Sequence, residues 1–364
     1  MKINIATPQI GKEEIDAVVA VMKTGMLAQG PKVAEFEEAF AKFIGTKYAI
    51  ATSNGTTALE VALRAYGIGE GDEVITTPFT FIASANSILY TGARPVFVDI
   101  DPETFNINPE AIEKAITKKT KAILPVHLYG SACDMTKIMA IAKKHKLAVI
   151  EDACQAHGAQ WKEKKVGSFG TGCFSLYPTK NMTVGEGGMI TTNDKAVYEK
   201  SLLLRAHGSK VRYYHDILGY NYRMSDMEGA IGTEQLKKLP KFNAARNKNA
   251  AYLSKELGKL KGIIVPLAPK NVSHVYHQYT IRVTKDFPIS RDEVLAKLTE
   301  VGIGTAVFYP LPVNRQVVYK NLGYKPNTPI ADELTSQVLS LPVHPGLSKA
   351  DLEFIVKTFQ NMTK

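Results

Sequence analysis

The chain has 364 residues, of which 45% are hydrophobic and 22% are charged, values typical of a globular protein of about two domains. No apolar run approaches the roughly 18 residues that a membrane-spanning helix requires. The first residues lack the apolar core and cleavage site of a signal peptide. We therefore expect a cytoplasmic protein without a membrane partner.

The formal net charge of +10 suits an anionic partner. The lysines are scattered, and no helix-turn-helix, zinc-finger or RNA-recognition signature accompanies them, so we do not expect nucleic acid as the partner. Three cysteines, Cys133, Cys154 and Cys173, are too widely spaced for a disulfide framework or a CxxC zinc site. They predict small buried side chains and no metal. The alternative is that Cys154 and Cys173 lie close to a functional site.

Residues 47–192 alternate short apolar runs with longer segments of helical spacing. The predicted strands are 48–52, 73–77, 95–99, 122–127 and 148–152, and the predicted helices are 56–66, 82–90, 109–116 and 135–145. This alternation predicts a mostly parallel sheet with crossover helices on both faces. We expect residues 1–238 to form a large three-layer α/β domain whose ligand lies beyond the carboxyl ends of the strands.

The pattern changes after about residue 235. Leu239-Pro240 interrupts a helical run that resumes to Leu260. Further strands are predicted at 277–283 and 305–309, and further helices at 291–301, capped by Ser290, and at 349–362. We expect residues 239–364 to form a smaller α+β domain.

Two charged residues follow apolar runs in the large domain. Asp152 ends the run Leu147–Ile150, and Lys180 follows Phe174–Leu176 and precedes a glycine-rich stretch. Such a pair fits pyridoxal phosphate (PLP), because a lysine amine can bind the cofactor aldehyde and a carboxylate can hold the pyridine nitrogen protonated. Each residue alone also fits a simpler interpretation, a turn aspartate and a solvated loop lysine.

A third element is the turn Ser53–Thr57, where a predicted strand ends and a helix begins. Free N–H groups and the helix dipole attract a phosphate there, and Ser175 can reach the same group. The turn alone also fits an ordinary helix cap.

Residues 205–223 are too rich in aromatic and basic side chains for a plain linker. Such a segment can hold a nucleoside diphosphate, stack on single-stranded nucleic acid, or pack on a subunit neighbour.

Eight motifs follow one another along the chain. They are NGTTAL, EVITTPFTFIASAN, PVFVDIDPETFNI, EDACQAHGA, FSLYPTKNMTVGEGGM, GYNYRMSD, FYPLP and LPVHPGLS. Their ordered combination is specific, although each motif alone is weak. Through these motifs the chain resembles the DegT/DnrJ/EryC1/StrS family of PLP-dependent sugar aminotransferases, which have the aspartate-aminotransferase fold. The resemblance runs from Pro8 through Leu347.

The resemblance implies that Lys180 is the Schiff-base lysine and that Asp152 pairs with the pyridine nitrogen, so both are catalytic. It also implies phosphate contacts from Gly55, Thr56 and Ser175.

Other cofactor contacts are implied for Gln155, near the ring hydroxyl, and Phe81, stacked on the ring. Asn221 is similar to a residue that reaches the phosphate from the partner subunit, which implies a homodimer with shared active sites. Arg223 and Tyr309 match positions near the sugar substrate.

The resemblance implies transamination of a nucleotide-linked keto-hexose, a 4-keto-6-deoxy sugar, with L-glutamate as the amino donor. Relatives that dehydrate such sugars carry histidine in place of Lys180, so this alternative is disfavoured. A 3-keto sugar is the other alternative. Phe308 stands where many members have histidine, and this departure concerns the contacts to the sugar.

Overall fold

The computed structural model describes residues 2–325 and 327–363. Its largest sheet has seven strands in the order β1-β9-β8-β5-β4-β2-β3. The strands are β1 (Tyr48–Thr52), β2 (Glu73–Thr76), β3 (Arg94–Phe97), β4 (Thr120–Leu124), β5 (Ala148–Asp152), β8 (Thr171–Ser175) and β9 (Gly188–Thr192). Only β9 runs antiparallel to its neighbours, β1 and β8. The predicted mostly parallel sheet is therefore confirmed, although β1 joins it through an antiparallel strand.

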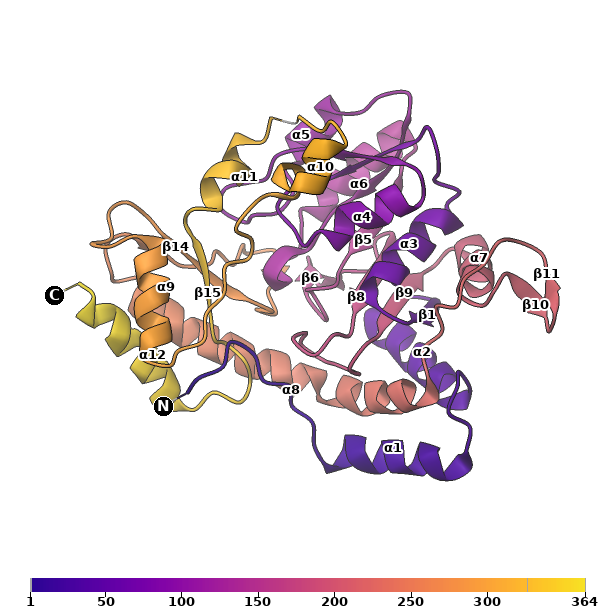
Figure 1. Cartoon of the computed structure of the whole chain (residues 1–364), viewed down its shortest axis with the longest axis horizontal. Coiled ribbons are helices and arrows are strands. Elements are labelled where there is room, and N and C mark those ends of the chain that lie inside the picture. The colour runs from indigo at the N-terminus through magenta and orange to yellow at the C-terminus, as the bar shows by residue number, and fades with distance from the viewer. Residues whose placement is uncertain (1, 326, 364) are drawn as a thin grey trace.

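Helices cover both faces of this sheet (Figure 1). One face packs against α3 (Gly55–Ala65), α4 (Ala83–Tyr90) and α7 (Lys195–Arg205), and the other against α2 (Pro31–Ile44), α5 (Pro109–Lys114) and α6 (Met135–His145). Residues alternate between the faces, because Ile50 packs with the α3 core whereas Ala49 and Ala51 pack with the α2 core. The three-layer α/β architecture expected from the sequence is confirmed.

The C-terminal part has its own antiparallel sheet in the order β12-β14-β15. It consists of β12 (Ile263–Ile264), β14 (Tyr279–Val283) and β15 (Val338–Leu341), with α9 (Arg291–Glu300) and α12 (Lys349–Asn361) sharing its core. Ser290 caps α9 as predicted, with its hydroxyl accepting from the Glu293 N–H. The predicted strand at 305–309 is wrong, because there only Ala306 forms an isolated bridge, to Ser340.

The interruption predicted at Leu239-Pro240 is also wrong. One helix, α8 (Asp226–Leu257), runs through Pro240 without a break. Packing on both sides compensates for the lost backbone hydrogen bond, since Leu236 belongs to one core and Leu253 to the other. The division predicted at 238/239 falls inside this helix and remains a prediction.

The remaining elements are short or peripheral. They are α1 (Lys12–Thr24), α10 (Val317–Asn321), α11 (Pro329–Leu334), the 3-10 helices η1 (Leu128–Gly130) and η2 (Val313–Arg315), the strands β6 (Gln160–Trp161), β7 (Lys164–Lys165) and β13 (Val272–Ser273), and the hairpin of β10 (Ser209–Val211) and β11 (Tyr214–His215). The hairpin projects from one end of the molecule beyond α7 (Figure 1). Among the described residues, no helix has the length and apolar character needed to cross a membrane.

Candidate active site

A cavity of about 670 Å³ opens where β5 and β8 end and α3 begins. Nine of the eleven predicted site residues line it: Gly55, Thr56, Phe81, Asp152, Gln155, Ser175, Lys180, Phe308 and Tyr309. Asn221 and Arg223 do not line it. The residues that the cavity brings together are spread over more than 250 positions of the sequence, and the sheet edge unites them.

The start of α3 forms the first wall of this cavity. Asn54 caps the helix, with its side-chain oxygen accepting from the Thr57 N–H at 2.9 Å. The N–H groups of Gly55 and Thr56 have no hydrogen-bond partner among the described residues. The cap interpretation therefore holds for Asn54, while two free donors at a helix N-terminus still face the cavity and suit a phosphate.

Gly55 is required by close packing against β8. A Cβ at this position would lie 2.7 Å from the Ser175 Cβ and 3.0 Å from the Cys154 sulfur. Cys154 is half-buried here and lines the cavity, in contrast to the fully buried Cys133 and Cys173. The expectation of three plain buried cysteines is thus wrong for Cys154.

We expect Gly55→Ala to weaken PLP binding about tenfold or more, because the added methyl displaces Ser175 and the free N–H groups from one another. Titration of the apoenzyme with PLP would measure this. Gly69→Ala is a matched control, since the nearest atom to its added Cβ is the Thr91 carbonyl oxygen at 3.7 Å. Equal affinity for the two variants would contradict a phosphate cradle at Gly55.

Asp152 lies at the floor with only 5% of its surface exposed. The Ser84 hydroxyl donates to its Oδ2 at 2.6 Å, and the Cys154 N–H donates to its Oδ1 at 3.1 Å. No described cationic side chain forms an ion pair with this carboxylate. A buried, unpaired carboxylate is costly, and a protonated ring nitrogen in the cavity would supply the missing cation.

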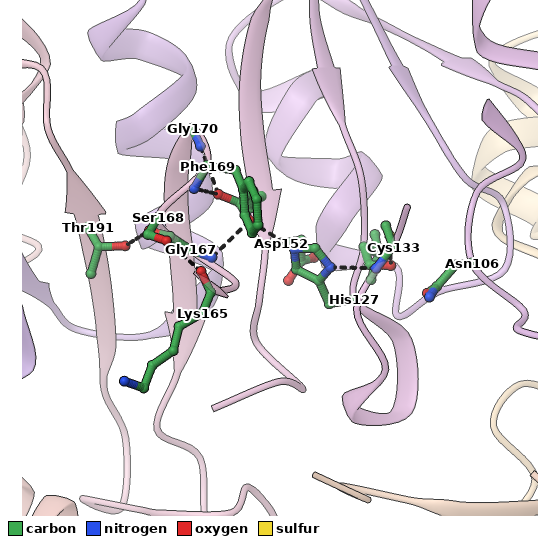
Figure 2. Close-up of polar contacts among 12 residues, drawn as sticks. Asn106, His127, Cys133, Asp152, Lys165, Gly167, Ser168, Phe169, Gly170 and Thr191 are labelled. Carbon is green, nitrogen blue, oxygen red and sulfur yellow. Dashed lines mark hydrogen bonds and ion pairs between the residues drawn. The ribbon is translucent and has the colours of Figure 1, made fainter. Parts of the chain in front are cut away.

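The end of β5 is fixed from the opposite face by Glu151, which is fully buried. Its carboxylate accepts from the backbone N–H groups of Gly167, Phe169 and Gly170 at 2.8–2.9 Å and contacts His127 Nε2 at 3.1 Å (Figure 2). The Cys133 N–H donates to His127 Nδ1, so Nε2 carries the proton that Glu151 accepts. These bonds hold the backbone that carries Asp152.

Lys180 follows β8 in a loop that returns to β9. Its N–H donates to the Tyr177 carbonyl at 2.9 Å, and the next side chain, Asn181, is tied to Asn243 and to the Val275 carbonyl. Burial lowers the pKa of the Lys180 amine from its ordinary value of 10.5, although Cys154 and Asp152 oppose this shift. A lowered pKa increases the neutral, nucleophilic fraction of the amine.

Gln155 is held in one orientation across the cavity. Its Oε1 accepts from the Tyr129 N–H at 2.9 Å, and its Nε2 donates to the Tyr309 hydroxyl at 3.1 Å. Burial raises the pKa of Tyr309, so this hydroxyl keeps its proton. Phe81 is 58% exposed although it is a large aromatic residue, and its ring is free to stack on a planar ligand.

Sequence reasoning missed several residues of the cavity. Ser84, Glu60 and Tyr222 line it, and Ser84 makes the shortest bond to Asp152. The motif containing Ser84 was recognised, but the residue lies 68 positions before Asp152. No local spacing reveals such a contact, and only the folded chain brings the start of α4 to the end of β5.

Comparison with known proteins gives this cavity a context. A family model described as the DegT/DnrJ/EryC1/StrS aminotransferase family matches residues 8–360. The chain is 46% identical, over 96% of its length and 94% of the relative's, to a protein named pleiotropic regulatory protein from Geobacillus stearothermophilus. It is 40% identical, over 96% of both chains, to UDP-2-acetamido-2-deoxy-3-oxo-D-glucuronate aminotransferase from Pseudomonas aeruginosa.

The structure is also similar to the PLP form of a sugar aminotransferase from Streptococcus pneumoniae, described as putative in its title. The TM-score is 0.94 at 29% identity, covering 100% of this chain and 99% of the other. The family implies dependence on PLP, and the free helix donors with the unpaired Asp152 fit that cofactor. The resemblance inferred from the sequence, the fold and the sugar aminotransferase activity are confirmed, and the chain belongs to the DegT/DnrJ/EryC1/StrS aminotransferase family.

Proposed function

We propose that this enzyme transfers an amino group from L-glutamate to a nucleotide-linked 4-keto-6-deoxy-hexose. The observation that carries the proposal is the meeting of Lys180, Asp152 and the free N–H groups of Gly55 and Thr56 in one cavity. A lysine, a buried carboxylate and a phosphate cradle are the three groups that hold the aldehyde, the ring nitrogen and the phosphate of PLP.

When bound, PLP accepts the electron pair left by a departing proton and stores the amino group between the two half-reactions. The residues of this chain supply the rest. Lys180 binds the aldehyde, and its released amine moves a proton to or from the substrate carbon. Asp152 keeps the ring nitrogen protonated, held by Ser84 and the Cys154 N–H. Gln155 and Phe81 orient the ring, and Ser175 binds the phosphate.

We propose a homodimer in which the partner's Asn221 completes each site. Asn221 is exposed and lies outside the cavity of its own chain, as this arrangement requires. The molecule also has an exposed apolar stripe on α1, beside the face on which Glu14 and Val21 are buried. It comprises Ile15, Val19 and Met22, which are 58%, 42% and 60% exposed. Such a stripe suits a subunit interface.

The charge of the cavity favours a sugar without a carboxylate at carbon 6. Among the described lining residues Lys180 is the one lysine or arginine. Because Lys180 binds the cofactor, the described lining of this chain offers no further lysine or arginine to a sugar carboxylate. Phe308 adds an apolar surface where many family members have histidine. A methyl group at carbon 6 suits this lining better than the uronate named for the Pseudomonas aeruginosa relative.

The 3-keto alternative has specific support, because the names of two relatives, that one among them, contain a 3-oxo or 3-dehydro sugar. Dehydration of a keto-sugar is disfavoured by Lys180. No arginine is among the described residues that line the cavity, and we assign the binding of the glutamate carboxylates to the partner's Arg223. Tyr309 and Phe308 are the proposed sugar contacts within the chain.

We expect the enzyme loaded with pyridoxamine phosphate to regain the visible absorbance of lysine-bound PLP when the correct nucleotide keto-sugar is added. A panel of 4-keto-6-deoxy and 3-keto sugars on UDP, GDP and dTDP would identify the acceptor. Recovery with a 3-keto sugar alone would contradict the 4-keto assignment. A PLP-loaded enzyme whose spectrum does not respond to glutamate would instead favour a regulatory role, as in the name of the Geobacillus relative.

A further inference from the structure

A buried glutamate at the rim of the cavity holds the segment that carries Asn221. Glu60 of α3 is 6% exposed, and its Oε2 accepts from the Tyr222 hydroxyl at 3.1 Å. Its other oxygen pairs with Arg64 Nε at 2.8 Å, one turn along the helix. Burial and the Glu60 charge raise the pKa of Tyr222 to about 12, so the hydroxyl remains a donor.

The backbone around Tyr222 is fixed at several points. Its carbonyl accepts from the Ser53 N–H at 2.9 Å, and its N–H donates to the Arg205 carbonyl at 3.0 Å. The rings of Tyr220 and Tyr222 stack at 4.9 Å with 5° between their planes, and the Arg64 guanidinium lies 5.2 Å from the Tyr220 ring centre. Glu60 therefore holds Tyr222, and Arg64 contacts Tyr220.

Alternate residues of this segment have opposite surroundings. Tyr220 and Tyr222 pack against the core formed by α3, whereas Asn221 between them is exposed. Consecutive side chains of an extended chain point to opposite sides. Anchoring the two tyrosines on Glu60 and Arg64 therefore sets the direction in which Asn221 leaves the subunit.

We propose that Glu60 is a positioning residue that acts across the dimer. By binding the Tyr222 hydroxyl of its own chain, it fixes Asn221 in the orientation needed at the cofactor phosphate of the partner subunit. This inference rests on the proposed dimer with shared active sites. It goes further because it gives Glu60 and Tyr222 a role at the partner's site, in addition to lining the cavity of their own chain.

The test uses the PLP affinity of the apoenzyme, measured by titrating the visible absorbance of lysine-bound PLP. Tyr222→Phe removes one hydrogen bond to a charged group, and we expect affinity to fall about fivefold to tenfold. Glu60→Gln is expected to lower it in the same direction. Tyr66→Phe is the matched control. It removes the 2.9 Å hydrogen bond between the Tyr66 and Thr171 hydroxyls, which lies at the C-terminal end of α3.

Mixed dimers separate an effect in cis from an effect in trans. A dimer of one Tyr222→Phe chain and one Lys180→Ala chain has a single absorbing site, which combines Lys180 of the first chain with Asn221 of the second. That Asn221 is held by an intact Tyr222, so we expect normal PLP affinity at this site. An affinity as low as in the Tyr222→Phe homodimer would overturn the inference.

The same design with Asn221→Ala tests the shared site itself. If Asn221→Ala is not restored by the Lys180→Ala partner, or if the protein is monomeric, the shared site is wrong and the inference falls with it. If Asn221→Ala is restored and Tyr222→Phe is not, only the inference is wrong. In homodimers, Tyr222→Phe should add no loss to Asn221→Ala, because its effect passes through that residue.

Discussion

Lys180→Ala is expected to abolish covalent PLP capture and to reduce transamination about 10³-fold or more, since one residue supplies both the bond to the aldehyde and the proton transfer. Borohydride reduction of the PLP-loaded enzyme should place the label on the peptide containing Lys180. In the variant this labelled peptide should disappear together with the visible absorbance.

Lys42→Ala is a suitable control, because Lys42 is exposed on α2 and does not line the cavity. It should retain the absorbance and the labelled peptide. Retention of the reduced label on another lysine of the Lys180→Ala protein, with activity preserved, would refute the assignment of Lys180.

Asp152→Asn is expected to lower kcat about 10²-fold to 10³-fold while PLP remains bound, because the amide keeps the shape but removes the charge that holds the ring nitrogen protonated. Single-turnover absorbance changes on adding glutamate would measure this chemical step directly. The lysine-bound absorbance should persist, which separates the loss from a failure to bind.

Ser84→Ala serves as the graded comparison for Asp152. It removes the 2.6 Å hydrogen bond to Oδ2 and leaves the charge, so we expect a loss of only about fivefold to tenfold. An equal loss in Ser84→Ala and Asp152→Asn would mean that orientation, not charge, is the contribution of Asp152.

Much of the α/β part could be predicted because its signals are local. The limits of β5 and α6 agree with the sequence pattern to the residue, since apolar runs and helical spacing act over a few neighbours. The same pattern predicts which strand ends meet, and this brings Asp152 and the start of α3 to one edge. The order of the strands, with β9 antiparallel, depends on pairings that no single segment encodes.

The wrong predictions, at Pro240 and at residues 305–309, fail because contacts between distant parts of the chain outweigh the local signal. Pro240 is an interrupting signal for an isolated helix, but packing of α8 on both cores outweighs it. The run at 305–309 has strand-like composition, yet β15 pairs with β14 in its place. Likewise the contacts Ser84–Asp152 and Glu60–Tyr222 join residues 68 and 162 positions apart, so only the folded chain reveals them.

The unbroken course of α8 also has a mechanical consequence. A helix of 32 residues is about 48 Å long at 1.5 Å per residue. It packs against α1 and α2 near its start and against α12 near its end (Figure 1). A rigid rod shared by both cores leaves no flexible joint at residues 238–239, so α8 would resist rotation of the C-terminal unit about this point. Enclosure of a bulky substrate is then expected to depend on smaller parts such as the hairpin.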